Sequence, residues 1–214
     1  MLSQALNHSY DSMLPVMYPQ MMSELRLSYG SIGMLVTAYR LSSGALQLVM
    51  SLLGRFVRRK VLLGLGMILQ SISNSLMAIS SKYEYILANR TLAGVGSSPQ
   101  HPVSTLYIVE NTTDRQLGRT LGARTTIAHT GSFLAPVMGS LMLEKFGWRS
   151  ALLIFSAPVL LSGLSLAFVR ESKLSRGWRG ASVRSMFKGA REALGDKSVL
   201  AVIVVETVMA VSYT

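Results

Sequence analysis

Four charged side chains fall inside long apolar stretches of this sequence, together with two histidines that titrate near neutral pH. They are His8, Asp11, Arg40, Arg90, His101 and Glu206. An ionised group is costly to hold in apolar surroundings and is usually kept there to bind a solute or to relay protons. We therefore take these six residues as candidates for a substrate or proton pathway.

The spacing of these residues places them in polar stripes on predicted helices. Residues three or four apart share a helix face. The stripes are His8 and Asp11; Arg40, Ser43 and Gln47; and Arg90, Gly94, Ser97 and His101. In an apolar solvent such a stripe must face other protein or a water-filled cavity. The three stripes together predict a polar pathway between helices.

The elements that carry these stripes are long and apolar. Half of the 214 residues are hydrophobic and only 14% are charged, and the mean hydropathy is +0.39. A soluble domain has about a quarter of its residues charged. A helix of about 20 apolar residues crosses a bilayer. Six such segments are expected at 3–22, 30–53, 61–80, 85–108, 124–143 and 150–169, with the start of a seventh at 198–214. The prediction is an all-α, polytopic membrane protein.

Three regions follow from this pattern: a six-helix bundle over 1–169, a basic loop over 170–197 and a truncated seventh helix over 198–214. Within the loop, apolar residues recur at helical spacing between basic ones. This pattern is typical of an amphipathic helix on the inner membrane surface, and a solvated linker is an equal alternative.

The basic residues predict the orientation of the helices. Fifteen lie in the segments around 55–60, 115–124 and 170–197, and four lie in the segments on the opposite side. The side rich in lysine and arginine faces the cytoplasm. The net charge of +11 is thereby explained without nucleic acid as a partner. The sequence has no cysteine, and we expect neither a metal site nor a cofactor.

Prolines and small residues suggest how the helices are arranged. Pro15 and Pro19 stand late in the first predicted helix, and Pro99 and Pro102 stand late in the fourth. Helices interrupted at matching positions point to the binding site of a transporter built from repeats, here three helices plus three. The spacing of Gly131, Ala135 and Gly139 favours close helix packing, and we interpret these three as packing residues.

These features resemble the major facilitator superfamily of secondary transporters. The resemblance rests on four segments: the basic loop Gly54-Arg55-Phe56-Val57-Arg58-Arg59-Lys60; the run Arg90-Thr91-Leu92-Ala93-Gly94-Val95-Gly96; Gly131 through Pro136 to Gly139; and Gly147-Trp148-Arg149. It implies that Gly54, Arg55, Arg58 and Arg59 belong to a gating loop. The family usually has an aspartate where Gly54 stands, so gating through that carboxylate is not expected here.

A narrower resemblance is to the fosmidomycin-resistance type of drug antiporter. It is carried by Leu27-Ser28-Tyr29-Gly30-Ser31-Ile32-Gly33-Met34 and by Gly96-Ser97-Ser98-Pro99-Gln100-His101-Pro102. That branch typically shows Asn-Asp early in its first helix, where this sequence has Asn7-His8 with Asp11 nearby.

The function that these observations favour is proton-coupled efflux or exchange of a small organic solute across the plasma or inner membrane. The chain would supply the N-terminal half of a longer carrier, with the C-terminal half, the lipid bilayer, protons and the solute as partners. A non-transporting membrane scaffold, or a half-transporter that needs a partner chain, is the main alternative. An intramembrane serine enzyme using Ser97 or Ser98 with His101 is a weaker one, because both serines lie on the same helix as the histidine.

Overall fold

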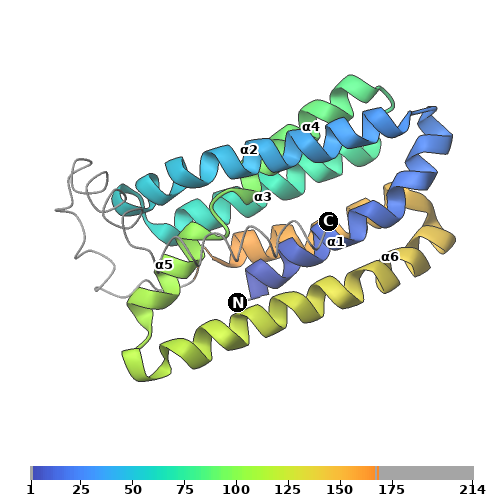
Figure 1. The fold of residues 1–214 in the computed structure, drawn as a ribbon. Coiled ribbons are helices and arrows are strands. Elements are labelled where there is room, and N and C mark those ends of the chain that lie inside the picture. Colours follow the sequence, from blue (N-terminus) through green and yellow to red (C-terminus); the bar gives the residue numbers. More distant parts are fainter. Residues whose placement is uncertain (1, 167, 169–214) are drawn as a thin grey trace, which may run out of the picture. The chain divides into compact units, whose positions relative to one another are not determined.

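The computed structural model describes residues 2–166 and 168, and within them the chain is helical without strands. The helices are α1 (Leu2–Leu25), α2 (Tyr29–Phe56), α3 (Arg59–Ile79), α4 (Tyr83–Ser97), α5 (Pro102–Asn111) and α6 (Asp114–Ser165) (Figure 1). The predicted all-α class is confirmed. The predicted basic loop at 170–197, the seventh helix and Glu206 lie outside the described residues.

The fifth and sixth predicted helices are the two arms of α6. Gly147 interrupts α6 with φ 73° and ψ 166°, a conformation open mainly to glycine because it has no Cβ. The second arm then runs back along the bundle (Figure 1). The first arm begins at Asp114, well before the predicted start at residue 124. The count of six helices in the bundle is confirmed.

The fourth predicted helix is interrupted between α4 and α5, at the prolines that the sequence singled out. Residues 98–101 form turns between α4 and α5, and Pro102 stands in the first turn of α5. Proline has no amide hydrogen and clashes with the preceding turn, so Pro99 and Pro102 both weaken the helix at this point. By contrast, α1 runs through Pro15 and Pro19 without a break. Of the two interruptions that were expected at matching positions, the one in the fourth predicted helix is found and the one in the first is not.

Helix α1 packs mainly against α6. A Cβ added at Gly131 would lie 2.5 Å from the Ser9 hydroxyl, and one added at Gly139 would lie 2.6 Å from the Met13 side chain. Ala135 between them is buried. The predicted close packing through Gly131, Ala135 and Gly139 is confirmed, and it brings the polar stripe of α1 into the interior.

Helix α4 packs against both α2 and α3. A Cβ at Gly94 would lie 2.6 Å from the Tyr39 carbonyl oxygen of α2. A Cβ at Gly96 would lie 2.6 Å from both the Gly66 oxygen and the Gln70 nitrogen of α3. Backbone atoms cannot give way as a side chain can, so these glycines fix the distance of α4 from its neighbours.

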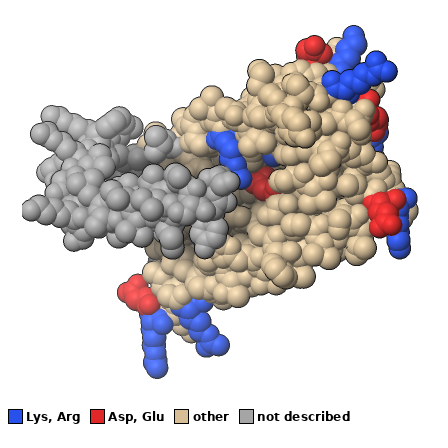
Figure 2. All heavy atoms as spheres, turned by 45° about the vertical axis from the view of Figure 1, so that its right-hand side comes forward, with Lys and Arg blue, Asp and Glu red and all other residues tan. Residues whose placement is uncertain are grey.

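The outer surface of the bundle suits an apolar solvent. By length and composition, two of the described helices, Arg59–Ile79 and Asp114–Ser165, are apolar enough to cross a membrane. Figure 2 shows the charged side chains of the face drawn gathered mostly toward its two ends, with a broad uncharged band between them. Helix α2, at 28 residues, is about 42 Å long at 1.5 Å per residue, which exceeds the apolar thickness of a bilayer.

Candidate functional site

Asp11 of α1, Tyr39 of α2 and Arg90 of α4 meet near the middle of their helices. The Tyr39 hydroxyl donates a hydrogen bond of 2.9 Å to Asp11 Oδ2. Arg90 Nη2 lies 3.9 Å from Asp11 Oδ1, and the Arg90 guanidinium lies 3.8 Å from the centre of the Tyr39 ring. The Arg90 side chain is only 4% exposed and that of Asp11 16%. One carboxylate thus faces a buried cation and a hydroxyl donor, and we call these three residues the central triad.

A polar cavity of about 90 Å³ adjoins the central triad. It is lined by Asn7, Asp11, Tyr39, Arg40, Ser43, Gly44, Gln47, Ser97 and His101. The predicted stripes of α1, α2 and the broken fourth helix therefore converge on one place. In Figure 2, small blue and red patches lie in a hollow of the otherwise uncharged band.

His101 lines this cavity, and His8 packs against His101. Their ring centroids are 5.2 Å apart, and the rings are nearly perpendicular. Gln4 Nε2 lies 3.4 Å from His8 Nε2. The sequence placed these histidines on separate stripes, and the structure brings the two stripes into contact.

The hydroxyls of Ser97 and Ser98 are engaged elsewhere. Ser97 Oγ lies 2.9 Å from the Ser43 hydroxyl and 3.1 Å from the Gly94 carbonyl oxygen. Ser98 Oγ donates to the Val95 carbonyl oxygen over 2.7 Å. Neither serine is hydrogen-bonded to His101 within the described part of the chain. The arrangement that a serine enzyme needs is therefore not formed.

Arg124 is a buried residue of α6, whereas the sequence analysis counted it among the loop cations. Its guanidinium donates to the Thr105 and Ser104 hydroxyls, each over 2.7 Å, and to the Gln4 side-chain oxygen. The assignment to a loop was wrong because α6 begins ten residues earlier, at Asp114. These partners tie α1, α5 and α6 together without an opposite charge.

Buried amides form a second group that the sequence did not single out. Gln70 Nε2 donates to Asn7 Oδ1 over 2.6 Å, which joins α3 to α1. The side-chain amides of Asn74 and Gln100 are buried with no hydrogen-bond partner within the described chain. Their sequence signal was a set of uncharged polar residues inside apolar helices, which is weaker than that of a charge. His129, by contrast, is exposed on α6.

The predicted gating loop covers the last turn of α2, the two linking residues and the first residue of α3. Gly54 is buried, and a Cβ there would lie 3.5 Å from the Val103 side chain of α5. Arg58 is exposed. Arg59 is ion-paired with Glu110 at the end of α5, and their side chains are only 4% and 13% exposed. The ion pair of Arg59 therefore connects the basic run to α5. The side chain of Arg55 lies outside the described part.

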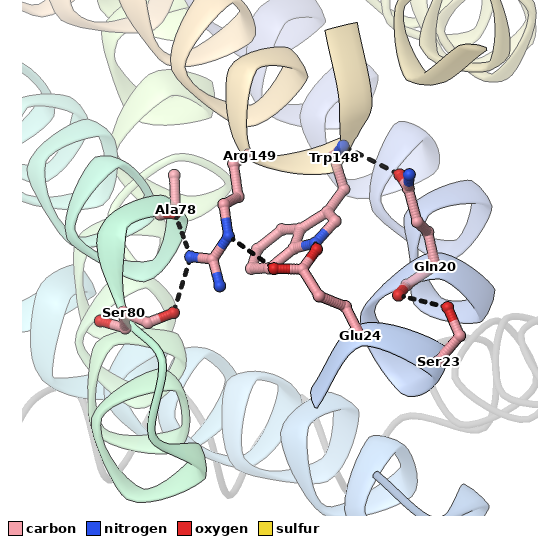
Figure 3. Close-up of polar contacts among 7 residues, drawn as sticks. All are labelled: Gln20, Ser23, Glu24, Ala78, Ser80, Trp148 and Arg149. Atoms are coloured by element: carbon pink, nitrogen blue, oxygen red, sulfur yellow. Dashed lines mark hydrogen bonds and ion pairs between the residues drawn. The ribbon is translucent and has the colours of Figure 1, made fainter. Parts of the chain in front are cut away.

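A cluster of paired groups closes the opposite end of the bundle, and we call it the Trp148 cluster (Figure 3). It comprises Gln20, Glu24, Ala78, Ser80, Trp148 and Arg149. The Trp148 indole donates to Glu24 Oε2 over 2.6 Å, and Arg149 Nε donates to Glu24 Oε1 over 3.0 Å. Arg149 Nη1 also donates to the carbonyl oxygens of Ala78 and Ser80.

Hydrogen bonds in the Trp148 cluster change the acidity of Glu24. The indole hydrogen bond, followed by that of Arg149 and its charge, lowers the pKa of the carboxyl from its ordinary value. The Trp148 amide also donates to the Gln20 side chain over 3.0 Å. The turn at Gly147 is thus held to the end of α1 and to the end of α3 by side chains that are almost all partnered.

An all-helical bundle with charges converging on an internal polar cavity, and with an uncharged band around it, is an architecture typical of membrane carriers. The family model described as "Major Facilitator Superfamily" matches residues 1–214. The chain belongs to the major facilitator superfamily, which confirms the resemblance found in the sequence. The narrower fosmidomycin-resistance likeness stays a prediction.

Individual relatives agree with this family. The chain is 28% identical over 167 residues to "Multidrug resistance protein 2" of Bacillus subtilis (strain 168), covering 76% of the chain and 40% of that protein. It is 25% identical over 162 residues to "Quinolone resistance protein NorA" of Staphylococcus aureus, covering 76% of the chain and 42% of that protein. The chain thus matches about two fifths of the length of these relatives.

A solved structure shares the fold. It is the crystal structure of a bacterial homologue of the human lysosomal transporter Spinster, in an inward-facing and occupied conformation. The TM-score is 0.74 at 18% identity, over 84% of this chain and 44% of that one. At this identity the likeness establishes the fold alone.

Proposed function

We propose that this chain forms the N-terminal half of a proton-coupled carrier that exports or exchanges a small organic solute across the plasma or inner membrane. The observation that carries the proposal is the central triad beside a polar cavity. The loops rich in arginine and lysine face the cytoplasm, as the positive-inside rule requires.

The central triad is suited to proton coupling because it holds a single carboxylate against a single buried cation. At the 3.9 Å separation of Arg90 and Asp11, an ionised pair attracts by about 4 kcal/mol at an effective dielectric constant of about 20. Protonation of Asp11 removes this attraction, while the Tyr39 hydroxyl still has an acceptor. One proton thereby changes how strongly α1 is held to α4.

The cavity and the family supply the second part of the proposal. Sites of such carriers lie near the middle of the membrane, and the two halves rock around them. His101 lines the cavity and His8 packs against it, so two imidazoles that can bind a proton lie next to the central triad. The names of two relatives, which refer to multidrug and quinolone resistance, favour export of organic solutes.

The test is transport by the complete gene product in proteoliposomes with an imposed pH gradient. Three probes of similar size and fixed charge are offered: p-toluenesulfonate, p-toluenesulfonamide and trimethylphenylammonium. We expect saturable movement of at least one of them, abolished by a protonophore. Movement of none would overturn the proposed transport function, and movement unaffected by the protonophore would overturn proton coupling.

A matched pair of variants locates the coupling. Asp11→Asn keeps the size of the side chain and an acceptor for Tyr39 but removes the charge, so we expect gradient-driven movement to be lost. Asp114→Asn removes a carboxylate that is exposed at the start of α6 and should leave transport intact. Equal flux in both variants would place the coupling outside the central triad.

A further inference from the structure

We infer that the solute is an organic anion and that Arg40 binds its negatively charged group; the inference rests on the proposed transport function. Arg40 lines the cavity, and the residue is exposed rather than buried between helices. Within the described residues, no carboxylate forms an ion pair with this cation.

The excess of positive over negative side chains inside the described helices favours an anionic ligand. Three guanidiniums, Arg40, Arg90 and Arg124, lie within the helices, and Asp11 is the one carboxylate that the described part of the bundle sets among them. That carboxylate is already engaged by Tyr39 and faces Arg90. Arg40 adds a positive charge that no carboxylate of the described bundle pairs, so a ligand that enters this cavity is favoured if it is negative.

The contacts of Arg40 leave its guanidinium available. The three ion pairs of the described residues involve Arg59, Arg90 and Arg149, not Arg40. The guanidinium carbon of Arg40 lies 6.0 Å from the centre of the Tyr39 ring, which is a long distance for a cation–π contact. An arginine binds a carboxylate, sulfonate or phosphate through two parallel hydrogen bonds.

The cavity around Arg40 is suited to the head of such an anion. Ser43, Gly44 and Gln47 follow Arg40 at helical spacing and line the same cavity. A Cβ added at Gly44 would meet no atom within 4 Å, so space is open beside the guanidinium. One water needs about 10–15 Å³ of accessible cavity volume, so a cavity of about 90 Å³ has room for a charged head group while the rest of the solute extends beyond it.

The experiment measures thermal stabilisation of the purified complete gene product by the same three probes. We expect p-toluenesulfonate to raise the unfolding temperature at lower concentration than p-toluenesulfonamide, with trimethylphenylammonium giving no shift. In Arg40→Gln the apparent affinity for the sulfonate should fall at least about tenfold. The matched control is Lys82→Gln, which removes an exposed positive charge ahead of α4 and should keep the wild-type affinity.

The order of the probes tests the inference even if Arg40→Gln folds poorly. Arg40→Lys, which keeps the charge but not the two parallel donors, should bind the sulfonate with intermediate affinity. Stabilisation by the ammonium probe and not by the sulfonate would overturn the inference, and so would unchanged sulfonate affinity in Arg40→Gln. In that case flux of the ammonium probe would still support the proposed transport function.

Repeating the measurement in vesicles distinguishes a lipid head group from a soluble solute as the source of the anion. If an anionic lipid head group occupies the site, adding phosphatidylglycerol to phosphatidylcholine vesicles should weaken sulfonate binding in the wild type but not in Arg40→Gln. If the anion is a soluble solute, both vesicle compositions should give the same affinity. Either result keeps an anion at Arg40, and binding independent of Arg40 in both compositions would overturn the inference.

Discussion

At the Trp148 cluster, Arg149 makes three hydrogen bonds and stacks 4.4 Å from the centre of the Trp148 ring. Arg90 in the central triad faces one carboxylate at 3.9 Å, and its Nε and Nη1 atoms have no hydrogen-bond partner within the described chain. The partnered arginine is 31% exposed in its side chain, and the underpartnered one is 4% exposed. For stability alone the reverse would be expected, because unpaired buried groups are the costly ones.

This contrast indicates a division of roles. The Trp148 cluster joins the ends of α1 and α3 to the turn of α6 and keeps them in one arrangement. In the central triad, where helices α1, α2 and α4 meet, two nitrogen atoms of Arg90 have no hydrogen-bond partner within the described chain. A site that exchanges protons or solute needs such unpaired donors, whereas a structural contact does not.

The largest effect is expected when Arg90 of the central triad is replaced by lysine in the complete gene product. Arg90→Lys keeps the charge but loses the planar group that stacks on Tyr39, so we expect at least a tenfold loss of flux at near-normal amounts in the membrane. His101→Ala should have the same phenotype, and the double variant should be no worse than either single one.

The matched control for that comparison is Arg149→Lys, which should transport normally. Flux and membrane abundance are measured together for each variant. Wild-type flux in Arg90→Lys, or a loss in Arg149→Lys that exceeds its loss of abundance, would reverse the division of roles between the two regions.

A second pair of variants compares the loss of stability on removing a buried, ion-paired arginine with that on removing an exposed one. Arg59 is buried with Glu110, whereas Arg58 beside it is exposed. Removing one member of a buried ion pair costs about 3–5 kcal/mol, so Arg59→Gln should unfold at a clearly lower temperature. Arg58→Gln should stay within about 0.5 kcal/mol of the wild type. Similar unfolding temperatures for both would mean that the pair contributes little.

The smallest effect is expected at Glu24, whose side chain is 46% exposed. Its pKa is lowered in the folded chain by the Trp148 and Arg149 hydrogen bonds. A lowered carboxyl pKa stabilises the fold fully above the ordinary value of 4.5, and this contribution is lost as the pH falls through the lower, folded-state pKa.

The measurement is the unfolding temperature of wild type and Glu24→Gln as a function of pH. The variant should be slightly less stable at neutral pH, and the two curves should converge as the medium becomes more acidic than pH 4.5. A difference that grows on acidification would contradict the assigned role of the carboxylate.

The sequence predicted the helices well because apolar length and helical spacing are local properties. It predicted the convergence of Asp11, Arg40, Arg90 and His101 because a polar stripe in a membrane helix must face inward. Which residues touch was not predictable in the same way. Tyr39 was missed because an aromatic residue in an apolar helix carries no signal of the hydrogen bond it makes.

Other errors came from the position of helix ends. Arg124 was placed in a loop because the segment before it is polar, although α6 already begins at Asp114. The prolines indicated an interruption near residues 98–101, but hydropathy is continuous across it, so the sequence did not show where α4 ends and α5 begins. Ends depend on tertiary contacts such as those of Arg124 with Ser104 and Thr105, which a local pattern does not contain.

The break between α4 and α5 has a mechanical consequence. Arg90 stands before it, in a segment held to α2 and α3 by Gly94 and Gly96. His101 stands at its far side, at the head of a segment tied to α6 through Ser104, Thr105 and Arg124. Pro99 and Pro102 supply no amide hydrogen, although Ser98 N–H still bonds the Gly94 carbonyl oxygen and Val103 N–H bonds the Pro99 carbonyl oxygen. Arg90 and His101 therefore stand on two helical segments that are anchored to different neighbouring helices.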